Sequence, residues 1–300
     1  MTVVGGPRLL DAAQVAGTPL RQGREQRATW AARWWPSWPR RANGVTAVSR
    51  RPAPIPAGVR HVPADLSDAD SLRPALDGAE ALFVLLAGGG TEVDPDAVLG
   101  TAKAAGVRRV LLSSQGVRTR PGAASHAHLG AFEAAVRGSG LEWTILRSGG
   151  FATNAYAWAA AAAAAAATRE RRLVAAPFAD VALPVIDPAD LAACAAVTLR
   201  ENHHTQVYKL TGPAAISPRN QAAALGAALG EEVTFVELTR TEAAAAMGAF
   251  MPPEVVAGTL DILGTPTPDE QLVSADVARL LGRGPCPFAA WAADHVAAFR

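Results

Sequence analysis

From Gly44 onward, short apolar segments alternate with segments of helical character, and this alternation limits the possible folds more than any other feature of the chain. Residues 81–87, ALFVLLA, form a continuous apolar run, as expected of a strand buried on both faces. The other strands predicted before residue 150 are 45–49, 59–66, 109–114 and 143–147, and helices are predicted over 97–105 and 128–137. Strands and helices in this order favour a parallel sheet with right-handed crossovers, which is a doubly wound α/β fold.

After Ser148 the alternation is less regular. Helices are predicted to start at Asp187-Pro188 and at Ser217-Pro218, because proline suits the first turn of a helix. Strands are predicted at 173–176, 183–186, 207–210 and 233–238. We therefore expect a main sheet domain over 44–150, a smaller mixed α/β lobe over 151–300 that returns elements to the main sheet, and an anomalous stretch over 1–43.

Composition excludes several classes of protein. Half of the residues are hydrophobic and the net charge is +1, so the chain can bury a core, and nucleic acid is not expected as its partner. Cys194 and Cys286 lack metal-ligand spacing, so no metal site is expected. The longest apolar run, 155–167, is predicted to be helical and is shorter than the roughly 20 residues of a membrane span. Since no export signal is evident either, we expect a cytoplasmic protein that does not bind a membrane.

Ligands of open parallel sheets bind beyond the carboxyl ends of the strands, and this rule selects Arg50 and Asp65. In a dinucleotide site, an arginine at the position of Arg50 suits a 2′-phosphate; the alternative is that Arg50 and Arg51 are solvated side chains in a turn. Ser67 is predicted to cap a helix that ends at Gly78, and Asp65 either hydrogen-bonds an adenine or caps that same helix.

The same rule selects the ends of the next two strands. Ala87 is followed by glycines at 88–90, which either let the backbone approach a ligand closely or form a turn. Ser114 is placed to hydrogen-bond a substrate carbonyl. Ser113 is suited to satisfying backbone groups, which is the commoner role of serines after strands.

Few residues near this edge are suited to proton transfer. His128 and His126 precede the helix 128–137, and either is a candidate to move a proton or a surface histidine. Lys103 and Lys209 are the only lysines in the chain, and neither lies four residues after a tyrosine.

Residues 44–300 resemble the NmrA-like group of atypical short-chain dehydrogenases/reductases, which bind NAD(P)H. The segments that carry the resemblance are VTAVSRRP, PADLSDADSLRPALDGAEALFVLL, AAGVRRVLLSSQGV, SGLEWTILRSGGFATN, DPADLAACAAV and YKLTGPAAISPRNQAAALG. The resemblance implies a Rossmann-like NAD(P)-binding domain in which Arg50 binds the 2′-phosphate of NADP(H). It also implies adenine contact at Asp65-Leu66 and a nicotinamide pocket bounded by Ala87-Gly88 and Ser113-Ser114.

Members of this group include quinone and azo-compound reductases, and also NADP sensors that perform no chemistry. The resemblance thus implies hydride transfer from NADPH to a quinone or similar small electron acceptor, with Ser114 or His128 polarising the acceptor oxygen. The missing tyrosine–lysine pair disfavours an alcohol dehydrogenase more than a quinone reductase, because the cofactor supplies the difficult chemistry. The alternative is a non-catalytic NADP-sensing regulator or a product deficient in cofactor binding.

One segment departs from the resemblance. Residues 21–41 hold four of the seven tryptophans and six arginines, and no three glycines within residues 1–44 have GxxGxxG spacing. That spacing builds the tight turn and the helix start that cradle a pyrophosphate. The expected glycine loop is therefore missing from the sequence.

A shifted reading frame explains this segment. Read one base early, codons for residues 23–43 can encode TGATGNVGRAVVAELAAAGER, which is a GxxGxxG loop followed by a helix. Tryptophan has only the codon TGG, so the pair Trp30-Ala31 must give glycine, the third of the fingerprint. The rival interpretation is an Arg/Trp-rich arm that binds nucleic acid or an anionic membrane, although Pro36 and Pro39 prevent one continuous helix. We favour the frame-shifted reading, which the nucleotide sequence can test.

Overall fold

The computed structural model describes residues 2–5, 9–15, 44–50, 59–87, 93–115, 120, 127–158, 173–249 and 251–300. The chain divides into two compact units. The first, which we call the sheet unit, comprises 1–117, 126–147 and 192–208, and the second unit comprises 118–125, 148–191 and 209–300. The cofactor and substrate roles predicted for the two halves of the chain stay predictions.

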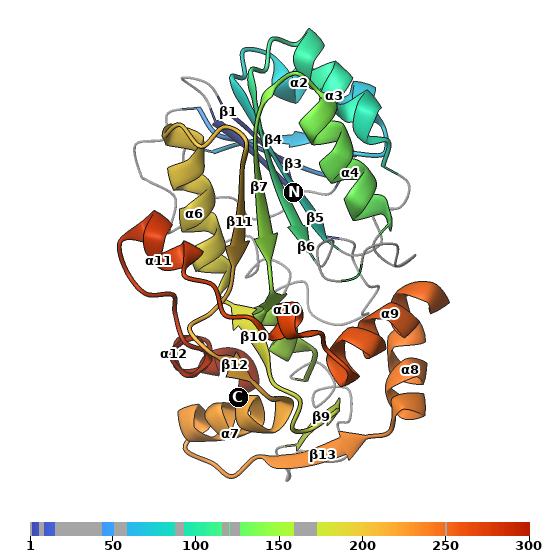
Figure 1. Cartoon of the computed structure of the whole chain (residues 1–300), viewed down its shortest axis with the longest axis vertical. Helices are drawn as coiled ribbons and strands as arrows, with labels where there is room; N and C mark the ends of the chain where they lie inside the picture. Colours follow the sequence, from blue (N-terminus) through green and yellow to red (C-terminus); the bar gives the residue numbers. More distant parts are fainter. Residues whose placement is uncertain are drawn as a thin grey trace. The chain divides into compact units, whose positions relative to one another are not determined.

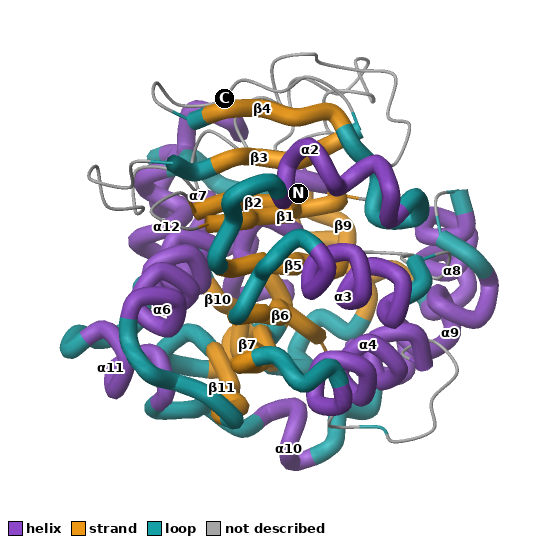
Figure 2. Tube along the Cα trace, turned by 90° about the horizontal axis from the view of Figure 1, so that it is seen from above, coloured by secondary structure: helices purple, strands orange, loops and turns teal. Residues whose placement is uncertain are grey.

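The described strands of the sheet unit form an eight-stranded sheet with the order β11-β7-β6-β5-β1-β2-β3-β4 (Figure 2). Its strands are β1 (Thr2–Gly5), β2 (Leu9–Val15), β3 (Thr46–Ser49), β4 (Arg60–Pro63), β5 (Ala81–Ala87), β6 (Arg109–Gln115), β7 (Glu142–Ser148) and β11 (Gln206–Leu210). The pairs β3–β4, β2–β5 and β5–β6 are parallel. The chain extends the sheet from β2 to β4 on one side and from β5 to β7 on the other, so the doubly wound α/β fold is confirmed.

The position between β3 and β5 is shared by two strands from the anomalous stretch. β2 runs parallel to β5, with Leu10 opposite Leu82 and Val15 opposite Ala87, whereas β1 is antiparallel to its neighbours. β2 thus supplies a parallel strand within 1–43, and the expectation that this stretch stands in place of a first strand, glycine loop and first helix stays a prediction. Residues 23–43, which the frame-shift hypothesis interprets as a misread glycine loop, lie outside the described residues.

Helices cover both faces of the sheet (Figures 1 and 2). α3 (Pro95–Ala104) and α4 (Ala127–Gly138) lie on one face and α6 (Pro188–Arg200) on the other. Leu82, Val84 and Leu85 of β5 are fully buried, which confirms the prediction from its continuous apolar run.

Helix starts follow local capping signals. The Asp94 carboxylate accepts hydrogen bonds from the backbone N–H groups of Asp96 and Ala97 at the start of α3. Ser217 caps α7 (Pro218–Leu229) as predicted, and Gly230 ends that helix in the left-handed conformation, with φ +71°.

The second unit has two small sheets and most of the remaining helices. The order β12-β10-β8 forms one sheet, and the parallel pair β13–β9 forms the other. The bounds are β8 (Gly150–Phe151), β9 (Leu173–Pro177), β10 (Leu183–Ile186), β12 (Ala215–Ile216), β13 (Thr234–Leu238), α8 (Arg240–Gly248), α9 (Pro253–Gly264), α10 (Pro268–Gln271), α11 (Asp276–Leu281) and α12 (Phe288–Asp294).

Two glycines allow backbones to cross closely in this unit. The N–H of Gly149 donates to Leu210 O at 2.9 Å, and the N–H of Gly212 donates to Val185 O at 2.9 Å. A Cβ atom at Gly212 would lie 2.2 Å from Val185 O, and one at Gly149 would lie 2.7 Å from Pro184 O. No side chain fits at either position without moving the neighbouring strand.

Most of the alanine-rich helix predicted around 155–167 lies outside the described residues. Among the helices that are described, none is long and apolar enough to span a bilayer.

Candidate functional site

The carboxyl end of β6 carries two buried hydroxyl groups. Ser113 and Ser114 are fully buried, and neither hydroxyl has a hydrogen-bond partner among the described residues. Leaving a buried hydroxyl unpaired costs about 1–3 kcal/mol, so such groups in native proteins call for an explanation, and a ligand is one. Because successive side chains of a strand point to opposite faces, the two hydroxyls lie on opposite faces of the sheet.

Arg50 and Asp65 lie together at the carboxyl ends of β3 and β4. Arg50 Nε is 3.7 Å from Asp65 Oδ2, and the two side chains are 49% and 29% exposed. The strand predicted over 59–66 ends at Pro63, so Asp65 and Leu66 lie in the turn after β4 rather than within the strand. The structure therefore brings two of the predicted cofactor residues into one ion pair.

The turn that follows β4 holds Asp65 in place. Asp65 Oδ1 accepts the N–H of Ser67 at 3.0 Å, which closes a turn ahead of the helix, so Asp65 does not cap that helix as one alternative predicted. The Ser71 hydroxyl accepts the N–H of Asp65 at 3.0 Å and donates to Asp68 O at 2.6 Å. The predicted cap at Ser67 is wrong, since Asp68 caps the 3₁₀ turn Ala69–Leu72 that leads into α2 (Arg73–Leu76). The cap lies one residue further on, because the Asp68 carboxylate accepts the N–H of Ser71.

The structure gives fewer contacts for the other predicted site residues. Leu66 is 3% exposed and packs into the core, so contact with an adenine would come from its backbone. Ala87 is the last residue of β5, two residues past Leu85, which lies opposite Ser113, and Gly88 lies outside the described residues. His128 is partly buried in the first turn of α4. Its role in proton transfer stays a prediction.

A buried ion pair joins α4 to β7, and sequence reasoning missed it. Glu133 is almost fully buried and binds Arg147 through two hydrogen bonds, at 2.9 and 2.7 Å, while Arg137 donates a third at 2.9 Å. Burial acts to raise the pKa of Glu133, but the hydrogen bonds and charges of Arg147 and Arg137 together hold that pKa below its ordinary value. The four-residue spacing from Glu133 to Arg137 was the available signal.

Sequence reasoning also missed Ser148, the last residue of β7. Its hydroxyl is buried and has no hydrogen-bond partner within the part of the chain that the structure describes. The carboxyl-end rule would have selected Ser148 had the predicted strand been extended by one residue.

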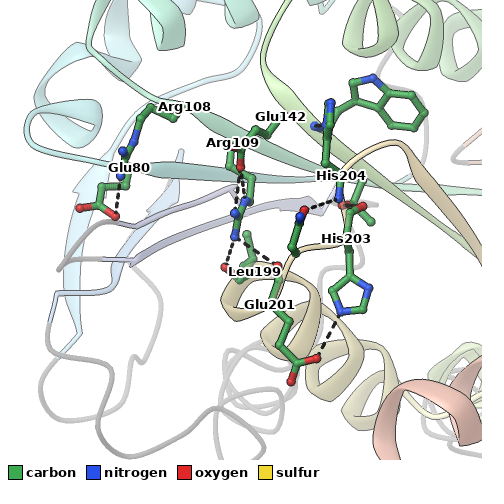
Figure 3. A network of polar contacts seen from close by, with 11 residues as sticks. Glu80, Arg108, Arg109, Glu142, Leu199, Glu201, His203 and His204 are labelled. Carbon is green, nitrogen blue, oxygen red and sulfur yellow. Dashed lines mark hydrogen bonds and ion pairs between the residues drawn. The ribbon is translucent and has the colours of Figure 1, made fainter.

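The opposite edge of the sheet carries a network of hydrogen bonds and ion pairs (Figure 3). Arg109, the first residue of β6, donates to Glu142 Oε2 at 3.0 and 2.8 Å, and to the carbonyl oxygens of Leu199 at 2.5 Å and Glu201 at 3.5 Å. His204 Nδ1 accepts the N–H of Trp143 at 3.1 Å. These contacts join the starts of β6 and β7 to the end of α6, which is a structural role.

The residues present fit the two ends of a dinucleotide. A half-exposed arginine at the end of β3 suits a 2′-phosphate, and unpaired hydroxyls at the end of β6 suit a polar group at the other end. The segment expected to bind the pyrophosphate lies outside the described residues. No cluster of metal-ligating side chains occurs among the residues that the structure describes.

Comparison with known proteins identifies relatives that are reductases. A family profile described as NAD(P)H-binding matches residues 40–187. The chain is 33% identical to (4-alkanoyl-5-oxo-2,5-dihydrofuran-3-yl)methyl phosphate reductase of Streptomyces griseus over 265 residues, covering 86% of this chain and 92% of the relative. It is 33% identical to NAD(P)H azoreductase of Xenophilus azovorans over 253 residues, covering 81% and 84%.

A solved structure agrees with these relatives. The NADPH-dependent quinone oxidoreductase of Escherichia coli superposes with a TM-score of 0.62 at 26% identity, over 83% of this chain and 89% of that one. The fold and the sequence matches agree with one another. The chain belongs to the NmrA-like, NAD(P)H-binding family of atypical short-chain dehydrogenases/reductases.

Proposed function

We propose that this protein is an NADPH-dependent reductase that acts on a quinone or a similar small electron acceptor. The observation that carries the proposal is the pair of buried, unpartnered hydroxyls of Ser113 and Ser114 at the edge of the sheet where ligands bind. The names of its relatives, which include an azoreductase and a quinone oxidoreductase, support an acceptor of this kind.

Each site residue has a distinct role in this proposal. Arg50 binds the 2′-phosphate through its guanidinium, and the turn at Asp65-Leu66 contacts the adenine. Ala87-Gly88 and Ser113 border the nicotinamide. When bound, NADPH supplies the hydride.

The acceptor is activated by the protein's own donors. Ser114 donates a hydrogen bond to the acceptor oxygen, which stabilises the negative charge that develops there during reduction. His128 delivers the proton that completes the reduction.

The glycine loop that would bind the pyrophosphate is missing from the sequence. The family match begins at residue 40, at the end of the tryptophan- and arginine-rich segment, which supports the view that 23–43 is a frame-shifted reading of the glycine loop. The absence of GxxGxxG spacing favours a second candidate, a protein that senses NADP without catalysis or binds the cofactor poorly.

Titration with NADPH, followed by fluorescence and combined with a quinone turnover assay, separates these functions. Micromolar binding with turnover is the result that the reductase requires. Binding without turnover identifies a sensor, and absence of binding identifies a chain deficient in the cofactor site. Either of the last two outcomes overturns the reductase for the chain as written.

A further inference from the structure

Arg50 already has a carboxylate partner within the protein. We propose that Asp65 acts as a built-in competitor of the 2′-phosphate for Arg50, and so sets how strongly the site prefers NADPH over NADH. This inference rests on the proposed role of Arg50 in binding the 2′-phosphate.

Hydrogen bonds within the turn fix the position of the Asp65 carboxylate. Asp65 Oδ1 accepts the N–H of Ser67 at 3.0 Å, and the oxygen of the Ser71 hydroxyl accepts the N–H of Asp65 at 3.0 Å. Oδ2 is the oxygen that lies 3.7 Å from Arg50 Nε. The turn therefore places a negative charge beside the arginine without needing a ligand to order it.

The pair is open enough for a ligand to reach. Arg50 is 49% exposed, and a separation of 3.7 Å is longer than a hydrogen bond, so the guanidinium still has donors for a phosphate. A 2′-phosphate bound to Arg50 would place its negative charge close to that of Asp65. NADH has a hydroxyl at this position, and a hydroxyl can donate to a carboxylate.

Arg50 and Asp65 therefore have opposite effects on the preference for NADPH over NADH. Arg50 favours the phosphorylated cofactor, whereas Asp65 disfavours it relative to NADH. An arginine with no acid beside it would give a strict NADPH preference, and the pair gives a weakened one. Exposed ion pairs are weak, so we expect an effect of about two- to fivefold rather than a complete switch.

Adenosine monophosphates test this inference without the glycine loop. 2′-AMP carries the phosphate that Arg50 would bind, 5′-AMP lacks it, and neither carries a pyrophosphate. Binding of each to the full chain is measured by NMR titration or calorimetry. We expect Asp65→Asn to raise the affinity for 2′-AMP relative to that for 5′-AMP about two- to fivefold, because a change in the adenine contact would alter both affinities alike. The gain should shrink at higher salt, which screens the charge of Asp65.

Matched variants keep the result interpretable. Asp70→Asn removes an exposed acid from the same turn, one that pairs with Arg73 at 2.8 Å, and it should leave both affinities unchanged. Asp65→Ser keeps an oxygen for the N–H of Ser67 but removes the charge, and it should reproduce the effect of Asp65→Asn. Thermal melting of each variant confirms that it is folded.

The failure of this inference is distinguishable from that of the proposed function. If Arg50→Gln weakens 2′-AMP binding but neither Asp65 variant raises the affinity for 2′-AMP relative to that for 5′-AMP, the inference is overturned. The role of Arg50 then stands. If Arg50→Gln has no effect, or if 2′-AMP does not bind, the role of Arg50 in the proposed function fails, and the inference fails with it.

Discussion

The two ends of β6 differ in how their polar groups are satisfied. At the amino end, the Arg109 guanidinium contacts the Glu142 carboxylate and two backbone carbonyls, so its donors have partners. At the carboxyl end, the hydroxyls of Ser113 and Ser114 are buried without partners among the described residues. The amino end of β6 is thus held by hydrogen bonds to its neighbours, and the carboxyl end holds the two hydroxyls for which we propose a ligand. Real proteins depart from full local satisfaction mainly where they function.

The ion pair between Glu133 and Arg147 limits how far this comparison extends. It lies on α4 and β7, and its charged groups are fully paired. The comparison is therefore specific to the hydroxyls of the carboxyl end and does not extend to every polar group near it.

The largest effect on stability is expected from Glu133→Gln. Removing one partner of a buried ion pair leaves the charge of Arg147 uncompensated, which should lower the free energy of unfolding by about 3 kcal/mol or more. Urea denaturation at pH 7 measures this value. A loss below about 1 kcal/mol would contradict the assignment of this pair as the main charge contact of α4.

Ser114→Ala tests the open end of the comparison. We expect a loss of about 10²-fold in kcat for quinone reduction, as for the removal of one donor to a developing oxyanion, with unchanged or slightly higher stability. The matched control is Ser139→Ala, because the Ser139 hydroxyl is satisfied by Val136 O at 2.8 Å and by the N–H of Leu141 at 3.1 Å. The control should lose about 1 kcal/mol of stability and no activity. The reverse pattern would mean that the unpaired hydroxyl has no function. Because this test needs a loaded enzyme, it is made on the form of the chain that binds NADPH.

Arg109→Met tests the satisfied end. Losing the hydrogen bonds of a charged group should destabilise the protein by about 2 kcal/mol, because the carboxylate of Glu142 and the carbonyls at the end of α6 lose their donor. Binding of 2′-AMP should not change. A clear change in that binding, with stability retained, would remove the distinction between the two ends.

The smallest effect concerns pH. The pKa of Glu133 is lowered in the folded protein, so the unfolded chain binds the proton more readily as the pH falls. The stability that Glu133 contributes should be complete well above its unfolded pKa of about 4.5 and should decline below it. Denaturation at pH 7, 5 and 4 measures this decline, and Glu133→Gln should reduce it. An equal decline in the variant would assign the pH dependence to other carboxylates.

Strong local signals in the sequence predicted much of the fold correctly. The bounds of β5 and β10 match the predicted 81–87 and 183–186, since each is a short apolar run with clear flanking signals, and Ser217-Pro218 correctly marks the start of α7. The cap at Ser67 was predicted wrongly, because the next residue, Asp68, also has a side-chain acceptor and caps the turn instead.

Contacts between distant residues were less accessible to sequence reasoning. The pairing of β2 with β5 joins residues about 70 positions apart, and no local pattern specifies it. Arg50 and Asp65 were each selected as strand-end residues, but their contact depends on the neighbouring strands β3 and β4. The Glu133–Arg147 pair likewise depends on how α4 packs against β7.

We propose that residues 44–300 hold the adenosine and nicotinamide ends of an NADPH site, and that the pyrophosphate loop is absent from the sequence. The most direct test compares NADPH binding by this chain with binding by a variant in which residues 23–43 are replaced by TGATGNVGRAVVAELAAAGER. We expect the variant to bind NADPH at least about 100-fold more tightly, which is the effect of two charge-assisted hydrogen bonds, while both proteins bind 2′-AMP equally. Equal NADPH affinity of the two proteins would contradict this account.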